Sequence, residues 1–265
     1  MTDPRWGSVV GAMTDASREP WRSGAAYLYV LHLDGPALAW EYLRRHPDYR
    51  RDWRCRRRRQ DAAQPWGLRW LENPDRDARD AHPVWCPEPS GVMQLHPDLA
   101  PTAEAVPFDL WDIAGHKHLF HDGRHLALTV AMPGCRRRFA LAPALAHGMP
   151  CVHAVHDGDP DAPLRANDTT PWACSRPRPG RAEWLEAHTL QALDATLAGA
   201  TSREVAEAWV GAVVVAADWH ADCALRARVR RLARRGAVLM RGGYRRLLQP
   251  APAAQGRWHD PAKRP

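Results

Sequence analysis

The sequence predicts an α+β protein with an N-terminal helical region, a small central antiparallel β-sheet and a C-terminal helix-turn-helix-like helical bundle. Apolar residues recur three and four positions apart in residues 36–43 and again in residues 183–248, which is the spacing of amphipathic helices. Between these regions, residues 118–130 carry apolar segments on both sides of an Asp-Gly pair. That pattern is typical of a β-hairpin.

Length and composition restrict the class of protein. A chain of 265 residues suits one large domain or two small ones, and its formal net charge of +7 favours a polyanionic partner without requiring one. No apolar run approaches the ~18 residues of a membrane span, and the N-terminus lacks the basic and apolar segments of a secretory signal. Six scattered cysteines without a CxxC pair predict free thiols. We therefore expect a cytoplasmic protein.

The first predicted domain covers residues 21–89. Pro36 is placed to begin a helix with Leu38 and Tyr42 on its buried side, and a second helix begins at Asp48. This second helix carries a basic block that extends from Arg50 to Arg59. The block is as consistent with a solvated helix end as with a contact to phosphate. Residues 65–89 are rich in Pro, Asp and Trp and are expected to form a partly buried strap.

The second predicted domain covers residues 108–248 and begins with the sheet, at residues 108–156. Three or four antiparallel strands are expected from the Asp-Gly hairpin, from a Pro-Gly turn at 133–134 and from a short apolar segment at 151–155. Residues 1–20 and 250–265 are expected to be disordered. Met13-Thr14-Asp15 repeats the opening Met-Thr-Asp, so either methionine fits as the start of translation.

The helical bundle is predicted at residues 182–248. Its first helix covers 183–197, and Thr201 and Glu204 have the spacing of a capping box at the start of a second, short helix that ends by Gly211. A third helix is predicted from Asp218 to Met240, ended by the glycine pair at 242–243. Two short helices joined by a tight turn are typical of a helix-turn-helix unit.

Nine arginines lie between residues 226 and 246, alongside apolar residues at helical spacing. Guanidinium groups bind phosphate oxygens in pairs and also bind the major-groove edge of guanine, so this segment predicts a surface for double-stranded DNA. However, only two of the 37 basic residues are lysines, and this bias raises every count of arginine. A structural basic helix, or a surface for RNA, an acidic protein or a membrane, therefore remains an alternative.

Three C-terminal segments, taken in order, resemble a known family. They are LQALDATLAGATSREVAEAWVG, VAADWHADCALRARVRRLARR and RGGYRRLL. The set is similar to the DNA-binding domain of the RovC-like regulators of type VI secretion, and the strands in HLFHDGRHLALTVAM lie where that family has its β segment. The N-terminal segments AAYLYVLHLDGPALAWEYLRRHPDYRRDW and WGLRWLENP are similar to a transcriptional-regulator-like domain that often precedes it. The chain departs from the family pattern at residues 220–223.

The resemblance implies a bacterial transcription regulator that binds double-stranded DNA through its C-terminal helices and is not an enzyme. We expect the amides at the Thr201 cap and Arg203 to approach the backbone, and the outer face of the long helix to read bases through Arg226, Arg230 and Arg234. We expect further arginines to contact flanking phosphates, and the protein to form a homo-oligomer. The predicted DNA-binding residues are Thr201, Ser202, Arg203, Arg226, Arg228, Arg230, Arg231, Arg234, Arg235, Tyr244, Arg245 and Arg246.

The strongest competing hypothesis is a zinc site formed by a group of histidines, because three imidazoles within reach of one another can hold zinc. No general-base motif such as HExxH accompanies them, and the chain contains no GxSxG, Walker A or GxGxxG motif. We therefore predict no cofactor, no metal and no catalysis. The histidines of this group are His116, His118, His121 and His125.

Overall fold

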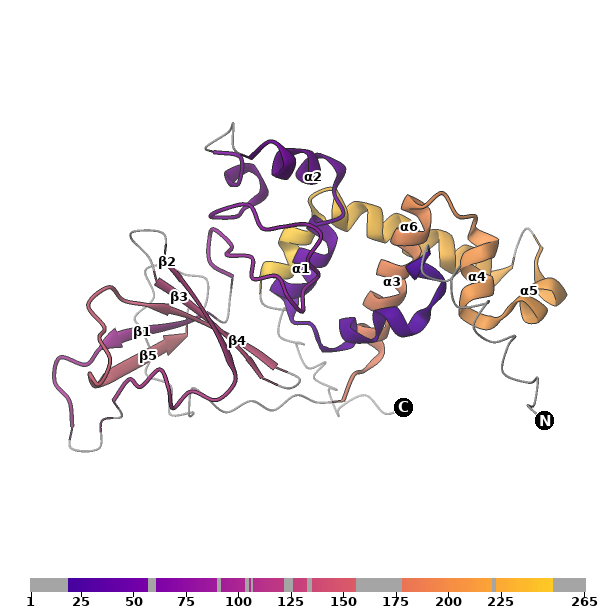
Figure 1. Ribbon diagram of the computed structural model, residues 1–265. Coiled ribbons are helices and arrows are strands. Elements are labelled where there is room, and N and C mark those ends of the chain that lie inside the picture. The colour runs from indigo at the N-terminus through magenta and orange to yellow at the C-terminus, as the bar shows by residue number, and fades with distance from the viewer. Residues whose placement is uncertain are drawn as a thin grey trace, which may run out of the picture.

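A computed structural model describes the chain at residues 19–56, 61–89, 92–102, 105, 107–121, 126–132, 135–155, 178–220 and 223–249. The sheet lies at one end of the molecule, helices α4 and α5 lie at the other, and α1, α3 and α6 lie between them (Figure 1). The α+β prediction is confirmed. The predicted disordered ends lie, apart from residues 19 and 20, outside the described residues.

The N-terminal helices begin where local capping groups place them. These elements are η2 (Pro20–Arg22), η3 (Gly24–His32), α1 (Gly35–Leu43), α2 (Pro47–Arg54) and η5 (Gln64–Trp66). The Asp34 carboxylate accepts the amide of Ala37 at 2.9 Å and so caps α1, while Nδ1 of His46 accepts the amide of Asp48 at 3.1 Å and caps α2. Each cap satisfies an amide that has no partner within its helix.

The sheet has five strands, in the order β2-β3-β4-β1-β5. They are β1 (Met93–Pro97), β2 (His116–His121), β3 (Leu126–Met132), β4 (Cys135–Leu141) and β5 (Cys151–Val155). The predicted hairpin is present as the antiparallel pair β2–β3. The additional strand is β1, which pairs parallel to β4 and antiparallel to β5, so the sheet is mixed. One face buries a separate apolar core built around Leu95, Leu128 and Phe139.

Four helices and a final 3-10 segment complete the chain: α3 (Arg181–Leu197), α4 (Ser202–Val210), α5 (Ala212–Asp218), α6 (Ala224–Met240) and η6 (Gly243–Leu248). The first two helices and the capping box at Thr201 are confirmed. The prediction of one helix over 218–240 is wrong, because residues 212–218 form a helix of their own and α6 begins only at Ala224. Gly211, with φ of 90°, lets the chain turn between α4 and α5.

The N-terminal helices and the C-terminal helices share one apolar core. Trp40 and Leu43 of α1 are fully buried together with Leu190 and Leu193 of α3 and Tyr244 of η6. Helix α6 contacts α3, α4 and α1 along its length. The two regions that the sequence places in separate domains therefore pack as one helical body.

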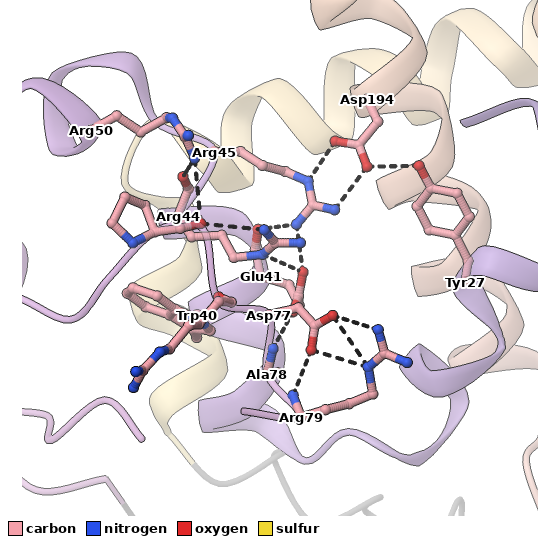
Figure 2. Close-up of polar contacts among 12 residues, drawn as sticks. Tyr27, Trp40, Glu41, Arg44, Arg45, Arg50, Asp77, Ala78, Arg79 and Asp194 are labelled. Carbon is pink, nitrogen blue, oxygen red and sulfur yellow. Dashed lines mark hydrogen bonds and ion pairs between the residues drawn. The ribbon is translucent and has the colours of Figure 1, made fainter. Parts of the chain in front are cut away.

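Buried polar groups join the same helices (Figure 2). The Glu41 carboxylate, which is 0% exposed, accepts hydrogen bonds from Arg44 at 2.8 Å, from Arg45 at 2.6 Å and from the amide of Ala78 at 2.6 Å. Arg45 also donates two hydrogen bonds, at 2.5 and 2.8 Å, to Asp194 of α3, which accepts a third from Tyr27. Burial alone would raise the pKa values of both carboxyl groups, but the charge of Arg45 holds them below their usual values. We call this set of residues the buried ion-pair network.

Helices α3 and α6 cross at close range because residue 236 has no side chain. A Cβ built on Gly236 would lie 2.9 Å from Cβ of Leu193 and 3.2 Å from the carbonyl oxygen of Thr189. We expect Gly236→Ala to separate the two helices and to lower the free energy of unfolding by ~1–3 kcal/mol, as overpacking does. Urea denaturation would measure this. Gly24→Ala is a matched control, since its Cβ would meet no atom within 4 Å; equal stability of the two variants would contradict the prediction.

In the described part of the chain, none of the helices combines the length and the apolar character needed to cross a membrane.

Candidate nucleic-acid interface

The outward face of α6 carries a line of arginines. Arg230 and Arg234 are four residues apart within α6, and Arg241, the C-cap residue of this helix, follows seven residues later, so all three lie on one side. Arg231 lies beside them, and all four residues are exposed. The opposite side of α6 is buried against α3 and α4 through Val229, Leu232, Gly236 and Leu239. We call the four arginines Arg230, Arg231, Arg234 and Arg241 the α6 ridge.

The guanidinium groups of the α6 ridge are not paired with acidic side chains of the described chain. Within the ridge, Nε of Arg234 donates a hydrogen bond of 3.2 Å to the carbonyl oxygen of Arg230, a neutral acceptor that leaves both charges uncompensated. Two further arginines flank the ridge: Arg226 is half-buried, and Arg228 is exposed with its guanidinium carbon 5.8 Å from the Trp209 ring centroid. The ridge therefore presents several unpaired cations in one direction.

Arg235 has a different role, because it points back into the protein. Its guanidinium binds both carboxylate oxygens of Glu186 on α3 and donates to Thr189 at 3.1 Å. The hydrogen bond to Glu186 raises the pKa of Arg235. Tyr42 of α1 donates to the same carboxylate at 2.6 Å. Arg235 thus connects α6 to α3 and α1. The sequence predicted it as a phosphate contact because the direction of its side chain depends on Glu186, which is distant in the sequence.

Tyr244 and Arg245 also make contacts within the protein. The Tyr244 ring is buried, and its hydroxyl donates to the carbonyl oxygen of Trp66 at 2.9 Å. Arg245 donates to the carbonyl oxygen of Pro65 at 2.5 Å, and its guanidinium carbon lies 5.2 Å from the Tyr244 ring centroid. These bonds attach η6 to the N-terminal region. Arg246 is exposed.

The N-terminus of α4 already contains a carboxylate. Glu204 accepts the Thr201 amide at 2.8 Å and the Thr201 hydroxyl at 2.9 Å, and the first of these bonds contributes most to lowering its pKa. Arg22 of η2 pairs with Glu204 at 3.1 Å, and Arg203 pairs with Glu207 at 3.0 Å. Ser202 is half-buried at the start of the helix. An incoming phosphate would meet these two carboxylates, so the predicted α4 contacts are less favourable for DNA than the α6 ridge.

Arg241 was not among the predicted DNA-binding residues, although the structure places it on the α6 ridge. The sequence held a signal for it, since a separation of seven residues from Arg234 equals two turns of helix. The predicted helix ended at Met240, so Arg241 lay just beyond the face to which DNA contacts were assigned.

The histidines of the proposed zinc site are only partly described. His116 and His118 lie in β2, opposite Ala131 and Thr129 of β3, while His125 lies outside the described residues. The His118 ring stacks on His82, with 3.5 Å between the ring centroids. Among the residues that the structure describes, no three His, Cys, Asp or Glu side chains are grouped so that they could hold a metal ion.

Comparison with known families assigns a class to this arrangement. Residues 159–249, which include α3 to η6, match the family model RovC, described as "T6SS, Transcription factor, DNA binding domain". Residues 20–71 match a proteobacterial transcriptional regulator-like domain, and residues 90–137 match a domain of unknown function. No curated protein matches the chain. These domains are those of a DNA-binding transcription regulator. The match over residues 159–249 confirms the resemblance to RovC-like DNA-binding domains that the C-terminal segments predicted.

Proposed function

We propose that this protein is a sequence-specific, double-stranded DNA-binding transcription regulator that contacts DNA mainly through the α6 ridge. The observation that carries the proposal is the separation of the α6 arginines into two kinds. The ridge arginines are exposed and lack acidic partners in the described chain, whereas the inward Arg235 is paired with Glu186. A helix that only kept the protein soluble would not require this unpaired positive face.

The dimensions of the α6 ridge suit a duplex. Arg230 and Arg241 are eleven residues apart, which corresponds to ~16 Å along a helix. An α-helix fits the major groove of B-DNA, where guanidinium groups can bind the O6 and N7 atoms of guanine. In this proposal Arg230 and Arg234 read bases, while Arg231, Arg241 and the flanking arginines contact phosphates.

The remaining parts of the proposal concern assembly and location. Helices α3 and α4 would form the helix-turn-helix-like unit that supports α6, with α5 inserted between α4 and α6. Because one ridge covers few base pairs, a homo-oligomer that binds repeated half-sites would gain affinity. Cytoplasmic location and the absence of catalysis belong to the same proposal, since the surface needs only to bind DNA.

Selection of bound fragments from a pool of random duplexes tests the proposal directly. An enriched sequence that binds more tightly than scrambled duplexes would support it. Equal retention of all duplexes, or stronger retention of single-stranded RNA of the same charge, would contradict it and favour a general polyanion surface.

Arg231→Ala separates phosphate contact from base reading. We expect this variant to bind every duplex more weakly by a similar factor and to reduce the slope of log K against log salt by about one unit, because one phosphate contact is lost. Fluorescence anisotropy at several salt concentrations would measure both quantities. Arg76→Ala removes an equal charge from an exposed position outside the α6 ridge and should keep the wild-type slope. An unchanged slope for Arg231→Ala would remove this residue from the interface.

A further inference from the structure

The C-terminal end of α6 is attached to the start of α2 in the N-terminal domain. Through Tyr244, η6 is bonded to the backbone of Trp66. The Trp66 ring lies 4.9 Å from the ring of His46, which caps α2, and its indole nitrogen donates to Asp52 of α2 at 3.1 Å. This chain of contacts links α2 to η6, which directly follows the end of α6.

Positive charge continues from one element to the other. Burial lowers the pKa of His46, and the charges of Arg241 on α6 and Arg51 on α2 lower it further, against the opposing effects of Asp48 and Asp52. Both arginines therefore lie near the same imidazole. The positive charge of the α6 ridge is therefore continued, beyond Arg241, by Arg51 of α2.

The exposed side of α2 is basic. Arg51 and Arg54 are three residues apart on this side, and both are exposed. Arg51 pairs with Asp48 at 2.9 Å, but their side chains are 67% and 50% exposed, and such a surface pair is weak enough for a phosphate to replace it. In the described chain Arg54 has no acidic partner, whereas Arg50 is paired with Asp75.

We propose that α2 carries a second contact to the phosphate backbone of the same duplex, so that the DNA-binding surface extends from the α6 ridge through Arg241 to Arg51 and Arg54. This inference rests on the proposed function. It assigns DNA contact to a domain whose matched family is described only as regulator-like.

Duplex DNA fits this surface better than a single strand. Single-stranded nucleic acids are held by exposed aromatic rings on which bases stack. The Tyr49 ring is fully buried, and the Trp53 ring is covered by Arg56, whose guanidinium carbon lies 3.7 Å from the ring centroid. The groups of α2 that can contact DNA are therefore the guanidinium groups of Arg51 and Arg54, which bind phosphates without reading bases.

The spacing of the two contacts is set by the interior of the protein. The buried ion-pair network and the shared apolar core join α1 to α3 and α6, and α2 follows α1 after a short turn. An α2 held in this way needs no reordering when DNA binds, so its arginines add affinity at low entropic cost.

Duplex length provides the test. Arg51→Ala/Arg54→Ala would be compared with wild type on the selected sequence in two forms, a duplex of ~10 base pairs and one of ~25 base pairs with flanks on both sides. On the long duplex we expect a loss of affinity of ~5- to 50-fold near 0.1 M salt and a salt slope lower by about one to two units. On the short duplex, which ends before α2, we expect binding like that of wild type. The ranking of sequences should not change.

The control is Arg178→Ala/Arg181→Ala, which removes the same charge from two exposed positions just before and at the start of α3. Wild-type affinity of Arg51→Ala/Arg54→Ala on the long duplex would overturn the inference. An equal loss in the control pair would also overturn it, because net charge alone would then explain the effect. Failure of the proposed function is distinguishable, since in that case wild type itself shows no preferred sequence.

Discussion

Replacing Arg45 with alanine is expected to lower the free energy of unfolding by ~3–5 kcal/mol, because it removes the cation that pairs with the buried Asp194 carboxylate and one of the two that pair with Glu41. The Arg45 side chain is only 9% exposed and contacts both Glu41 and Asp194. After the substitution, the Asp194 carboxylate would keep only the hydrogen bond from the Tyr27 hydroxyl within the buried ion-pair network.

Urea denaturation of Arg45→Ala measures this loss. Arg50→Ala is the matched control: Arg50 pairs with Asp75, whose side chain is 70% exposed, so its removal should cost no more than ~1 kcal/mol. If Arg45→Ala were as stable as this control, the buried ion-pair network would not be what joins α1 to α3.

Removing Arg230 and Arg234 together is expected to have the largest effect on DNA binding. Each substitution to alanine should weaken binding to the preferred sequence by ~1–3 kcal/mol if the side chain reads a base, and should relax the preference at that position. Both residues are exposed on the outer face of α6, so the fold should be preserved.

Anisotropy titrations against the selected duplex and against single-base variants of it would measure both effects. The double variant must also unfold in urea at the same concentration as wild type, which would show that α6 is intact. If the double variant bound the selected duplex as wild type does, the α6 ridge would not be the contact surface.

The helices were largely predictable because their signals are local. Pro36 at the start of α1, the Thr201–Glu204 capping box and the leucines of α3 each act within a few residues, and the structure has all three. Helix α5 was missed because residues 212–217 are only Ala and Val and contain neither a cap nor an amphipathic pattern. β1 was missed because prolines surround it and its pairing with β4 depends on a strand more than 40 positions later.

The candidate site could be predicted as a helix but not residue by residue. Nothing in the neighbourhood of Arg235 distinguishes it from Arg234, and the difference arises from Glu186, which is far away in the sequence. The same holds for Tyr244, whose partner is the backbone of Trp66. Sequence patterns identify which face of a helix is apolar, whereas the orientation of the border residues depends on distant partners.

The shared core also determines the order in which the protein can fold during synthesis. Trp40 and Leu43 leave the ribosome early, but Leu190 and Tyr244, against which they are buried, emerge some 150 to 200 residues later. At ~5–20 residues per second, the nascent N-terminal helices expose apolar surface for roughly ten seconds or more. Chaperones thus have a window in which to bind them, and the apolar core is complete only once α6 and η6 have been synthesised.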